Sequence, residues 1–496
     1  MKFKRSSGIL LHISSLPGKY GIGTFGTEAY EFVDFLISSR QRIWQLLPLG
    51  HTGYGDSPYQ CYSAFAGNPL LIDSEILVKQ KYLTEAELET TLTFSESEVE
   101  FDKVHAHKTP LLEKAAERFK THASRVERVK YESFCEQNEY WLNDYAIFIA
   151  LKQKHEGKPW WEWDEKYRFW EKEKKDEIES GLNDSIFRNK VIQFFFYSQW
   201  VDLKSYANRN GIQIIGDIPL YIAHDSADAW RHHKNFWFDE QRNPVRVAGV
   251  PPDYFSETGQ LWGNPLYNWE YLEENRFEWW IERIKASFKL FDILRIDHFR
   301  GLAAYWAVPF GEKTAVKGDW LVAPGKSLLD TIYYELGELP IIAEDLGVIT
   351  PDVEELRDGF NFPGMKILQF AFDTAEENEF RPHTYPRNCV VYTGTHDNNT
   401  TKGWYRESSE ADKQMVSDYF NPDENNISWS FIKLAMASVA DMAIFPIQDL
   451  LDLDESARMN IPSVPSGQWK FRFKSGSLND ELIDKLVRFT KLYGRI

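Results

Sequence analysis

The 496-residue sequence contains only three cysteines, Cys61, Cys135 and Cys389. None of them lies in a CxxC pair or another spacing typical of metal ligands, and a sparse, odd number of cysteines is typical of a reducing compartment. The basic start of the chain is followed by an apolar run at residues 9–11 only, which is shorter than the roughly 7–15 residues of a signal-peptide core. We therefore expect a cytoplasmic protein.

The sequence also lacks long apolar segments and an excess of positive charge. No apolar stretch reaches the roughly 18 residues that a membrane-spanning helix needs. There are 57 Lys and Arg residues against 75 Asp and Glu residues, which gives a net charge of −18. Proteins that bind nucleic acids or anionic membranes usually carry a basic patch. We therefore expect neither nucleic acid nor a membrane as a partner.

What the chain does contain is a regular alternation of apolar runs and helical patterns. Near-continuous apolar runs of about 4–8 residues are typical of buried parallel strands. Eight such runs occur, at residues 8–13, 43–50, 212–220, 292–299, 340–347, 366–373, 389–397 and 442–449. Helical patterns lie between or after most of them, at residues 28–40, 190–210, 269–290, 327–337, 350–358, 427–440 and 478–493.

This alternation predicts the α/β class and, within it, a (β/α)₈ TIM barrel. A doubly wound open sheet is the structural alternative. Eight is the number of strands in the barrel, and no GxGxxG turn follows the first strand, so the barrel is favoured. No internal repeat or low-complexity tract is visible.

Two segments interrupt the alternation and are interpreted as insertions. Residues 1–71 hold the first two strands, and residues 72–189 are too long for one connecting helix, so we expect a mainly helical subdomain there. Residues 190–496 hold the remainder of the barrel. Within them, residues 221–268 are rich in aromatic residues and turn formers and are expected to form an ordered loop over the working end of the barrel.

Polar residues stand at the ends of five of the predicted strands. In a barrel, function collects at the carboxyl ends of the strands, so these residues are the first candidates for a site. They are Asp217, the group Arg295, Asp297 and His298, the pair Glu344 and Asp345, Asp373, and the group His396, Asp397 and Asn398. Clustered carboxylates have two common uses, which are metal binding and acid–base or nucleophilic chemistry on a glycosidic bond.

The metal interpretation receives little support from the sequence. The only H-x-H pattern, His105 and His107, lies in the charged helical insertion, where a solvent-exposed helix face is the expected role. His232 and His233 lie in a loop and are also expected at the surface. We therefore predict no metal and no other cofactor.

The glycosidic interpretation fits the spacing of the residues. Asp297 and Glu344 end consecutive strands, which lie about 4.8 Å apart, and a retaining glycosidase needs its two carboxyl groups about 5–5.5 Å apart. Arg295 lies two residues before Asp297, on the same face of the strand, where its charge would keep Asp297 ionised. Glu344 has no such neighbour and is expected to retain its proton. The alternative, that these residues form rim ion pairs and helix caps, weakens when Asp397 is added as a third carboxylate.

Aromatic residues in loops complete the predicted site, because aromatic rings stack on the apolar faces of sugars. Candidates are Tyr54, Tyr59, Tyr254, Phe255 and Trp262. For any one of them alone, packing within its own loop is the alternative.

Taken together, long stretches of the sequence resemble one family, the amylomaltases or 4-α-glucanotransferases (disproportionating enzymes) of the α-amylase-like superfamily. The resemblance covers nearly the whole chain. It includes SSGILLHISSLPGKYGIG, HTGYGDSPYQ, GDIPLYIAHDSADAW, GVPPDYFSETGQLWGNPLYNW, LRIDHFRG, IIAEDLG, GMKILQFAFD, YTGTHDNNTTKGW, IFPIQDLL and RMNIPS. One departure lies at residues 467–472, where GQWKFR stands in place of a GNWxWR-like run, and it concerns the acceptor side of the site.

The resemblance implies a retaining transfer of α-1,4-glucan segments between α-1,4-glucans and malto-oligosaccharides. It assigns Asp297 as nucleophile, Glu344 rather than Asp345 as general acid and base, and Asp397 as the carboxylate that stabilises the transition state. It also implies sugar-binding roles for Tyr59, Asp217, Asp253, Tyr254, Phe255, Gln260, Trp262, Arg295, Asp373 and His396.

Two functional alternatives stay open at this stage. A hydrolase of the same fold would have the same local residues, and a non-catalytic glucan-binding protein would keep the aromatic residues. The aromatic block PWWEWDEKYRFW at residues 159–170 also has two interpretations, as core, which we favour, or as a second glucan contact.

Overall fold

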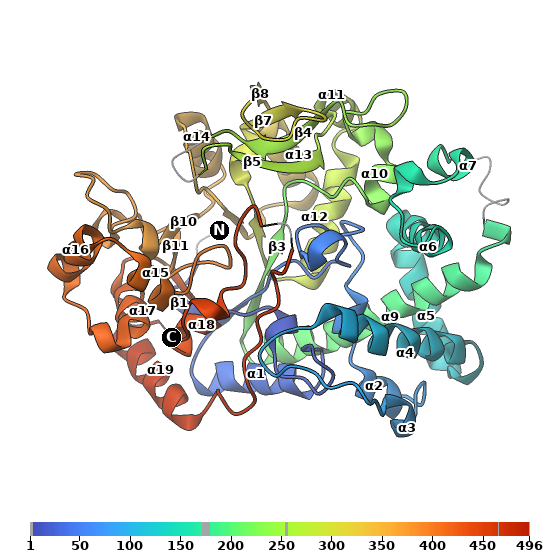
Figure 1. The fold of residues 1–496 in the computed structure, drawn as a ribbon, viewed down its shortest axis with the longest axis horizontal. Coiled ribbons are helices and arrows are strands. Elements are labelled where there is room, and N and C mark those ends of the chain that lie inside the picture. The colour runs from blue at the N-terminus through green and yellow to red at the C-terminus, as the bar shows by residue number, and fades with distance from the viewer. Residues whose placement is uncertain (1–2, 171–178, 253–255, 465, 496) are drawn as a thin grey trace.

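The computed structural model describes residues 3–170, 179–252, 256–464 and 466–495. Eight strands form one parallel sheet in the order β10-β11-β12-β1-β2-β3-β6-β9 (Figure 1). Their bounds are β1 Ser6–Leu10, β2 Ile43–Gln45, β3 Gln213–Ile218, β6 Ile293–Ile296, β9 Ile341–Ala343, β10 Gly364–Ile367, β11 Cys389–Tyr392 and β12 Met442–Pro446. The N–H of Ala343 donates to the carbonyl of Pro363 at 3.0 Å across the two ends of this order. The sheet therefore curls into the predicted eight-stranded barrel.

Each of the eight apolar runs overlaps one barrel strand, but β1 and β10 begin two residues before their runs, and all eight strands are shorter than the runs. After β2, for example, Leu46, Leu47 and Leu49 remain buried although the strand has ended. The N–H of Leu46 still donates to the carbonyl of Ile215 at 2.9 Å, whereas Leu47 and Leu49 are buried in the loop that follows. Apolar composition follows burial, not strand geometry, so it overestimates the strand length.

Helices cover the outside of the barrel. They are α1 Thr27–Ser38, α9 Asn183–Arg209, α11 Trp269–Glu274, α12 Glu278–Leu290, α13 Gly325–Leu336, α14 Pro351–Gly359, α15 Thr401–Glu407, α16 Glu410–Phe420, α17 Ile427–Ala437, α18 Ile447–Leu450 and α19 Asp480–Leu492. Pro351 occupies the first turn of α14, where a missing N–H costs no helical hydrogen bond.

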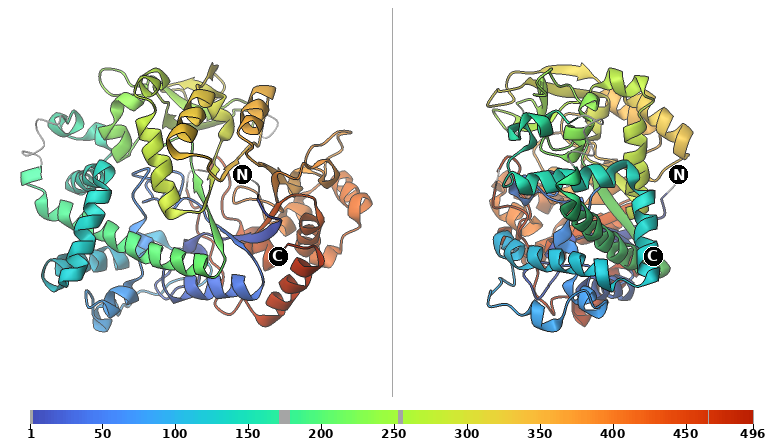
Figure 2. Two further views of the ribbon diagram at one scale, coloured as in Figure 1. Left: turned by 180° about the vertical axis from the view of Figure 1, so that it is seen from behind. Right: turned by 90° about the vertical axis from the view of Figure 1, so that its right-hand side faces the viewer.

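The segment between β2 and α9 folds mainly into helices. They are α2 Ser74–Lys79, α3 Glu85–Leu88, α4 Phe101–His122, α5 Arg125–Gln137, α6 Glu139–Lys154 and α7 Glu165–Arg168. They gather on one side of the molecule, opposite α15 to α19 (Figures 1 and 2). The aromatic block in this segment belongs mainly to the core, because Trp160, Trp163, Tyr167 and Trp170 are buried.

A second sheet, which the sequence pattern did not identify, lies beside the barrel. Its antiparallel strands have the order β5-β4-β7-β8, with β4 Arg246–Val250, β5 Gln260–Pro265, β7 Ala304–Pro309 and β8 Asp319–Val322. The helix α10 Ala227–Arg231 precedes β4. The strands are short, and β4 pairs with β7 from a distant part of the chain. The local alternation of apolar and polar residues therefore did not predict this sheet.

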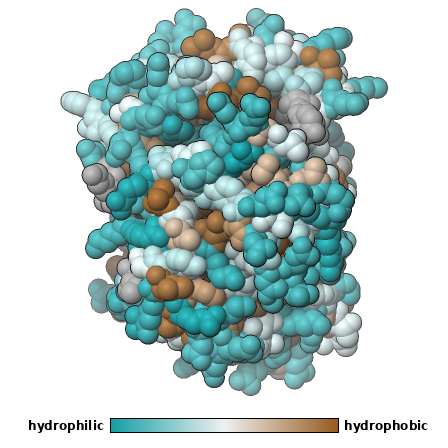
Figure 3. All heavy atoms as spheres, turned by 90° about the vertical axis from the view of Figure 1, so that its left-hand side faces the viewer, coloured by the Kyte–Doolittle hydropathy of each residue, from teal (hydrophilic) through white to brown (hydrophobic). Residues whose placement is uncertain are grey.

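The face in Figure 3 is largely hydrophilic, with hydrophobic residues in small separate groups. Among the described residues, no helix combines the length and apolar character needed to cross a membrane. All three cysteine thiols are free.

Two arginine side chains donate hydrogen bonds to carbonyls at the C-terminal end of α17, and one of them also binds the first barrel strand. Arg495, which is 0% exposed, donates to the carbonyls of Met436 at 2.8 Å, Ser6 at 3.0 Å and Ser438 at 3.2 Å. Arg5 donates to the carbonyls of Met436 and Ser438 at 2.9 and 2.8 Å. Positive charge at this position also matches the negative end of the helix dipole.

We therefore expect Arg495→Met to lower the free energy of unfolding by about 3 kcal/mol or more, because several buried carbonyls lose a charged donor. Chemical denaturation followed by circular dichroism measures the change. Arg488→Met, on the exposed face of α19, is the matched control and should change stability by less than about 0.5 kcal/mol. Equal denaturation midpoints for the two variants would contradict this account of Arg495.

Candidate active site

Four carboxylates, which lie in or after four different strands, meet at one rim of the barrel. Asp217 lies within β3, and Asp297 and Glu344 directly follow β6 and β9. The N–H of Asp297 donates to the carbonyl of Ile218, and the N–H of Glu344 donates to the carbonyl of Ile296, both at 3.0 Å. Backbone pairing thus continues one residue past each strand and fixes the height of both side chains. Asp397 joins them from the loop after β11.

Arg295 is the centre of this group. Its side chain is 4% exposed, and Nη1 lies 2.7 and 2.6 Å from the two oxygens of Asp217 and 2.9 Å from Oδ1 of Asp297. Asp217 and Arg295 are register partners on adjacent strands, and Arg295 and Asp297 share one face of the same strand. The spacing in the sequence predicted the second contact, and the structure shows it.

Glu344 is held by backbone donors instead of a cation. Its Oε2 accepts from the N–H of His298 at 2.6 Å, and its Oε1 accepts from the N–H of Leu346 at 3.3 Å. His298 has a left-handed backbone conformation with φ 54°. Burial raises the pKa of Glu344 to about 8, and the neighbouring charge of Asp297 adds to this shift.

Asp297 is less perturbed than Glu344. Burial raises the pKa of Asp297 to about 6, and Arg295 limits the rise. The sequence predicted that Arg295 favours the ionised form, and it does so against a larger cost of burial. The pKa of Glu344 is thus raised further than that of Asp297, so Glu344 keeps its proton to a higher pH than Asp297 does.

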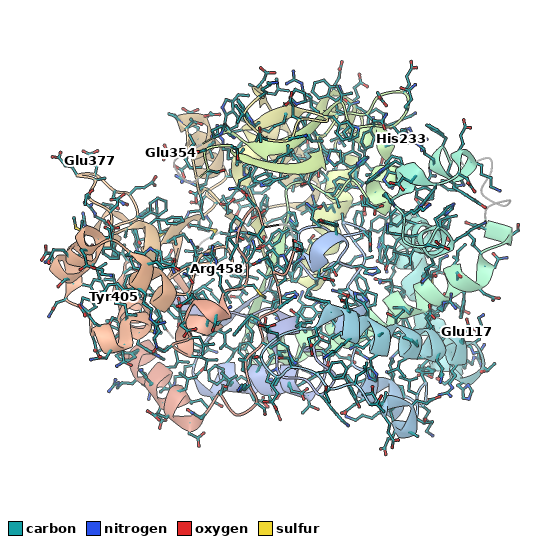
Figure 4. All side chains as sticks on the ribbon, viewed as in Figure 1. Glu117, His233, Glu354, Glu377, Tyr405 and Arg458 are labelled. Carbon is teal, nitrogen blue, oxygen red and sulfur yellow. The ribbon has the colours of Figure 1, made fainter. Side chains whose placement is uncertain are left out.

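Asp397 has a third environment. His396 Nε2 lies 3.3 Å from its Oδ2, and the Asn460 amide donates to its Oδ1 at 2.6 Å. Burial works against ionisation, but His396 and Asn460 outweigh it and hold the pKa of Asp397 well below its usual range. Arg458, near the centre of the view in Figure 4, donates to the backbone carbonyl of Asp397 at 2.7 Å.

Aromatic rings lie against this rim. The hydroxyl of Tyr59 donates to Asp217 at 2.7 Å, and its ring stacks on His396 at 5.1 Å between centroids. Trp469 packs beside both rings, at 5.7 Å from Tyr59 and 5.9 Å from His396. From the second sheet, Trp262 meets His298 edge to face at 4.7 Å.

A sequence profile described as 4-alpha-glucanotransferase matches residues 11–479 of this chain. The chain belongs to the 4-α-glucanotransferase family. It is 48% identical over 496 residues to a 4-alpha-glucanotransferase of Synechocystis sp., covering 99% of this chain and 98% of that protein. It is also 48% identical to a 4-alpha-glucanotransferase of Thermus thermophilus, covering 97% of both chains.

Solved structures agree with this assignment. The amylomaltase from Streptococcus agalactiae in complex with acarbose is 41% identical and superposes with a TM-score of 0.96, covering 99% of this chain and all of that one. The amylomaltase from Corynebacterium glutamicum is 18% identical, with a TM-score of 0.78 over 99% of this chain and 74% of that one, and it shows a shared fold.

Not every site residue predicted from the family resemblance joins this group. Asp373 is exposed, and its carboxylate contacts Asn378 at 3.0 Å and Arg381 at 3.7 Å within its own loop. Gln260 accepts from the indole N–H of Trp262 at 3.2 Å. The remaining three, Asp253, Tyr254 and Phe255, lie outside the described residues.

The histidines considered as metal ligands have other neighbours. His105 lies 3.9 Å from Asp56, and the ring of His107 stacks on Tyr20. His232 lies 4.0 Å from Asp144. Over the described ranges, no group of three or more His, Cys, Asp or Glu side chains is placed to hold a metal ion.

Two residues that contact Asp397 were missed by the sequence analysis. Arg458 and Asn460 belong to the RMNIPS run, which carried the family resemblance but received no role. They lie in a loop after the last strand, and the alternation of strands and helices does not predict where such a loop packs. Only the tertiary packing brings this loop across the rim.

The inserted helical segment anchors the chain that carries Trp469. The N–H of Val99 donates to Lys470 at 2.7 Å, and the N–H of Arg472 donates to Ser97 at 2.9 Å. The Arg472 side chain donates to the carbonyl of Ser95 at 2.7 Å. The insertion thus holds one side of the rim in this member of the 4-α-glucanotransferase family.

We expect Arg472→Met to loosen this attachment, because the buried guanidinium is replaced by a side chain without donors. Amide hydrogen exchange of peptides covering residues 95–99 and 468–473 should become at least about tenfold faster, as expected for the loss of about 1.4 kcal/mol of local stability. Lys474→Met, an exposed neighbour, is the control. Unchanged protection in Arg472→Met would contradict the anchoring role.

Proposed function

We propose that this chain is a 4-α-glucanotransferase that moves α-1,4-glucan segments between malto-oligosaccharides by a retaining double displacement. The observation that carries the proposal is the half-buried pair of carboxyl groups that directly follow β6 and β9. Asp297, with a pKa of about 6, and Glu344, with a pKa of about 8, have the protonation states that a nucleophile and a general acid need at neutral pH.

In the first step, Glu344 gives its proton to the glycosidic oxygen while a carboxylate oxygen of Asp297 attacks the anomeric carbon. The bond from that carbon to the glycosidic oxygen breaks, and the reducing-end piece leaves as an alcohol. The donor piece remains joined to Asp297 as an ester. In the second step, Glu344 takes the proton of an acceptor 4-hydroxyl, whose oxygen attacks the same carbon and releases Asp297.

The ion pair between Arg295 and Asp217 is compatible with the change of charge at Asp297 during the reaction. When Asp297 becomes an ester it loses its negative charge, and Arg295 would be left as an isolated buried cation without another partner. The two oxygens of Asp217 at 2.7 and 2.6 Å keep it paired throughout. This avoids the large cost of an uncompensated buried charge.

Asp397 is assigned to the stabilisation of the transition state. Its depressed pKa keeps it anionic beside the sugar, where positive charge develops on the ring. Hydrogen bonds to sugar hydroxyls that strengthen in the transition state lower the barrier, whereas equal binding to the ground state does not.

The remaining sugar contacts are proposed on position and chemistry. Tyr59 and His396 form a stacked aromatic wall beside Asp217, and Trp262 faces His298 next to Asp297. The proposal also keeps the other predicted contacts, which are Asp253, Tyr254, Phe255, Gln260, Arg295 and Asp373. The cytoplasmic location stays a prediction.

The rival functions are separated by the products from maltotriose. Transfer gives glucose and a ladder of longer oligosaccharides, hydrolysis gives only glucose and maltose, and a binding protein gives no products. We expect the ladder. A product mixture restricted to glucose and maltose would replace this proposal with a hydrolase.

We expect Asp297→Asn and Glu344→Gln each to lower kcat on maltotriose by roughly 10³-fold or more, since each removes a reacting group. Asp345→Asn is the matched control for Glu344, because the Asp345 carboxylate is directed away to Arg357 at 2.6 Å and the N–H of Met365 at 2.7 Å. It should lower the thermal midpoint and keep kcat within a few fold. High activity of either reacting-group variant would refute the assignment.

The pH dependence follows from the same pair. Below a pH of about 6, Asp297 gains a proton and ceases to be a nucleophile. Above a pH of about 8, Glu344 loses its proton and ceases to be an acid. We expect a bell-shaped profile of kcat/KM with limbs near these two values. An acidic limb near the ordinary carboxyl pKa of about 4 would show that burial does not control Asp297.

A further inference from the structure

One buried carboxylate at the barrel rim has no part in the proposed mechanism. Asp449 lies in α18, three residues after the end of β12, and is 1% exposed. Burial raises its pKa, and hydrogen bonds from Thr393 and Thr401 oppose the rise. A buried carboxylate costs free energy unless donors surround it, so its partners indicate what it does.

Asp449 accepts three described hydrogen bonds, and their donors are two threonines at the two ends of one loop. Oδ2 accepts from the hydroxyl of Thr393 at 2.5 Å and from the hydroxyl of Thr401 at 2.7 Å, and Oδ1 accepts from the N–H of Thr401 at 2.7 Å. Thr393 directly follows β11, and Thr401 is the first residue of α15. One carboxylate thus joins the start of the loop to its end.

The loop between these threonines carries His396 and Asp397. Inside it, the side chain of Asn398 accepts from the N–H and the hydroxyl of Thr395, both at 2.9 Å. The Gln369 amide donates to the carbonyl of Asn399 at 2.9 Å. The loop is therefore held by its own hydrogen bonds and by one from Gln369, and Asp449 joins its two ends.

We propose that Asp449 is a positioning residue for Asp397, a role that rests on the proposed function of Asp397. Asp449 touches neither the sugar nor a reacting atom. By fixing both ends of the loop, it holds the Asp397 carboxylate at the distance at which it stabilises the transition state. A displacement of about 1 Å in such a group is enough to cost roughly 10²-fold in rate.

The test compares Asp449→Ala with Asp292→Ala. Asp292 is a matched control at the opposite end of the barrel, where its carboxylate accepts from the N–H of Ile214 at 2.8 Å and from the Asn208 amide at 2.7 Å. Both variants should lower the thermal midpoint. On maltotriose, Asp449→Ala should lower kcat roughly 10²-fold with KM within threefold, since Asp397 acts mainly in the transition state. Asp292→Ala should keep kcat within twofold.

A double-mutant cycle separates positioning from general damage. In the Asp397→Asn background, assayed with a maltosyl fluoride donor so that the residual rate is measurable, Asp449→Ala should cost less than threefold. Independent losses that multiply would overturn the proposal. So would a kcat of Asp449→Ala within twofold of the parent, because Asp449 would then only stabilise the fold.

Two milder variants keep the proposal testable if Asp449→Ala does not fold. Thr393→Val and Thr401→Val each remove one hydroxyl donor, and each should lower kcat two- to tenfold, by the usual contribution of about 0.5–1.5 kcal/mol per hydrogen bond. Unchanged kcat in both would refute the inference. An active Asp397→Asn enzyme would instead refute the proposed function, so the two failures are distinguishable.

Discussion

The site depends on one buried cation shared by two carboxylates. Arg295 is nearly inaccessible to solvent, and its charge is balanced by Asp217 on the adjacent strand and by Asp297 two residues further along its own strand. Because an unpaired buried charge is strongly destabilising, the barrel has to place β3 and β6 side by side in this register. The same requirement fixes the position of the carboxylate to which we assign the attack on the sugar.

The three carboxylates proposed for catalysis differ in environment more than in chemistry. Glu344 has backbone donors and burial, Asp297 has burial moderated by Arg295, and Asp397 has His396 and the Asn460 amide. These surroundings separate their pKa values in the order that the proposed roles of proton donor, nucleophile and permanent anion require. Segments outside the barrel complete the rim, and the helical insertion anchors the loop segment that carries Trp469.

The amino-acid sequence determined the barrel and most of the rim. Eight apolar runs marked eight strands because both faces of a parallel barrel strand are buried, and the polar residues at the ends of five runs marked the working face. The step of two from Arg295 to Asp297 predicted their contact. Spacing alone did not separate Glu344 from Asp345, and that choice came from family resemblance. The structure adds its reason, since Asp345 is engaged by Arg357.

Only the tertiary structure decided which loops meet at the rim. Asn460, Arg458 and Trp469 approach Asp397 and Tyr59 from a segment after the last strand, and Asp449 closes the loop that carries Asp397. The four antiparallel strands likewise come from separate parts of the chain. Periodicity reports how a segment buries its own side chains, whereas such contacts depend on where distant loops pack. The sequence therefore determined the scaffold and its reactive edge, and the packing of loops determined the electrostatic surroundings of that edge.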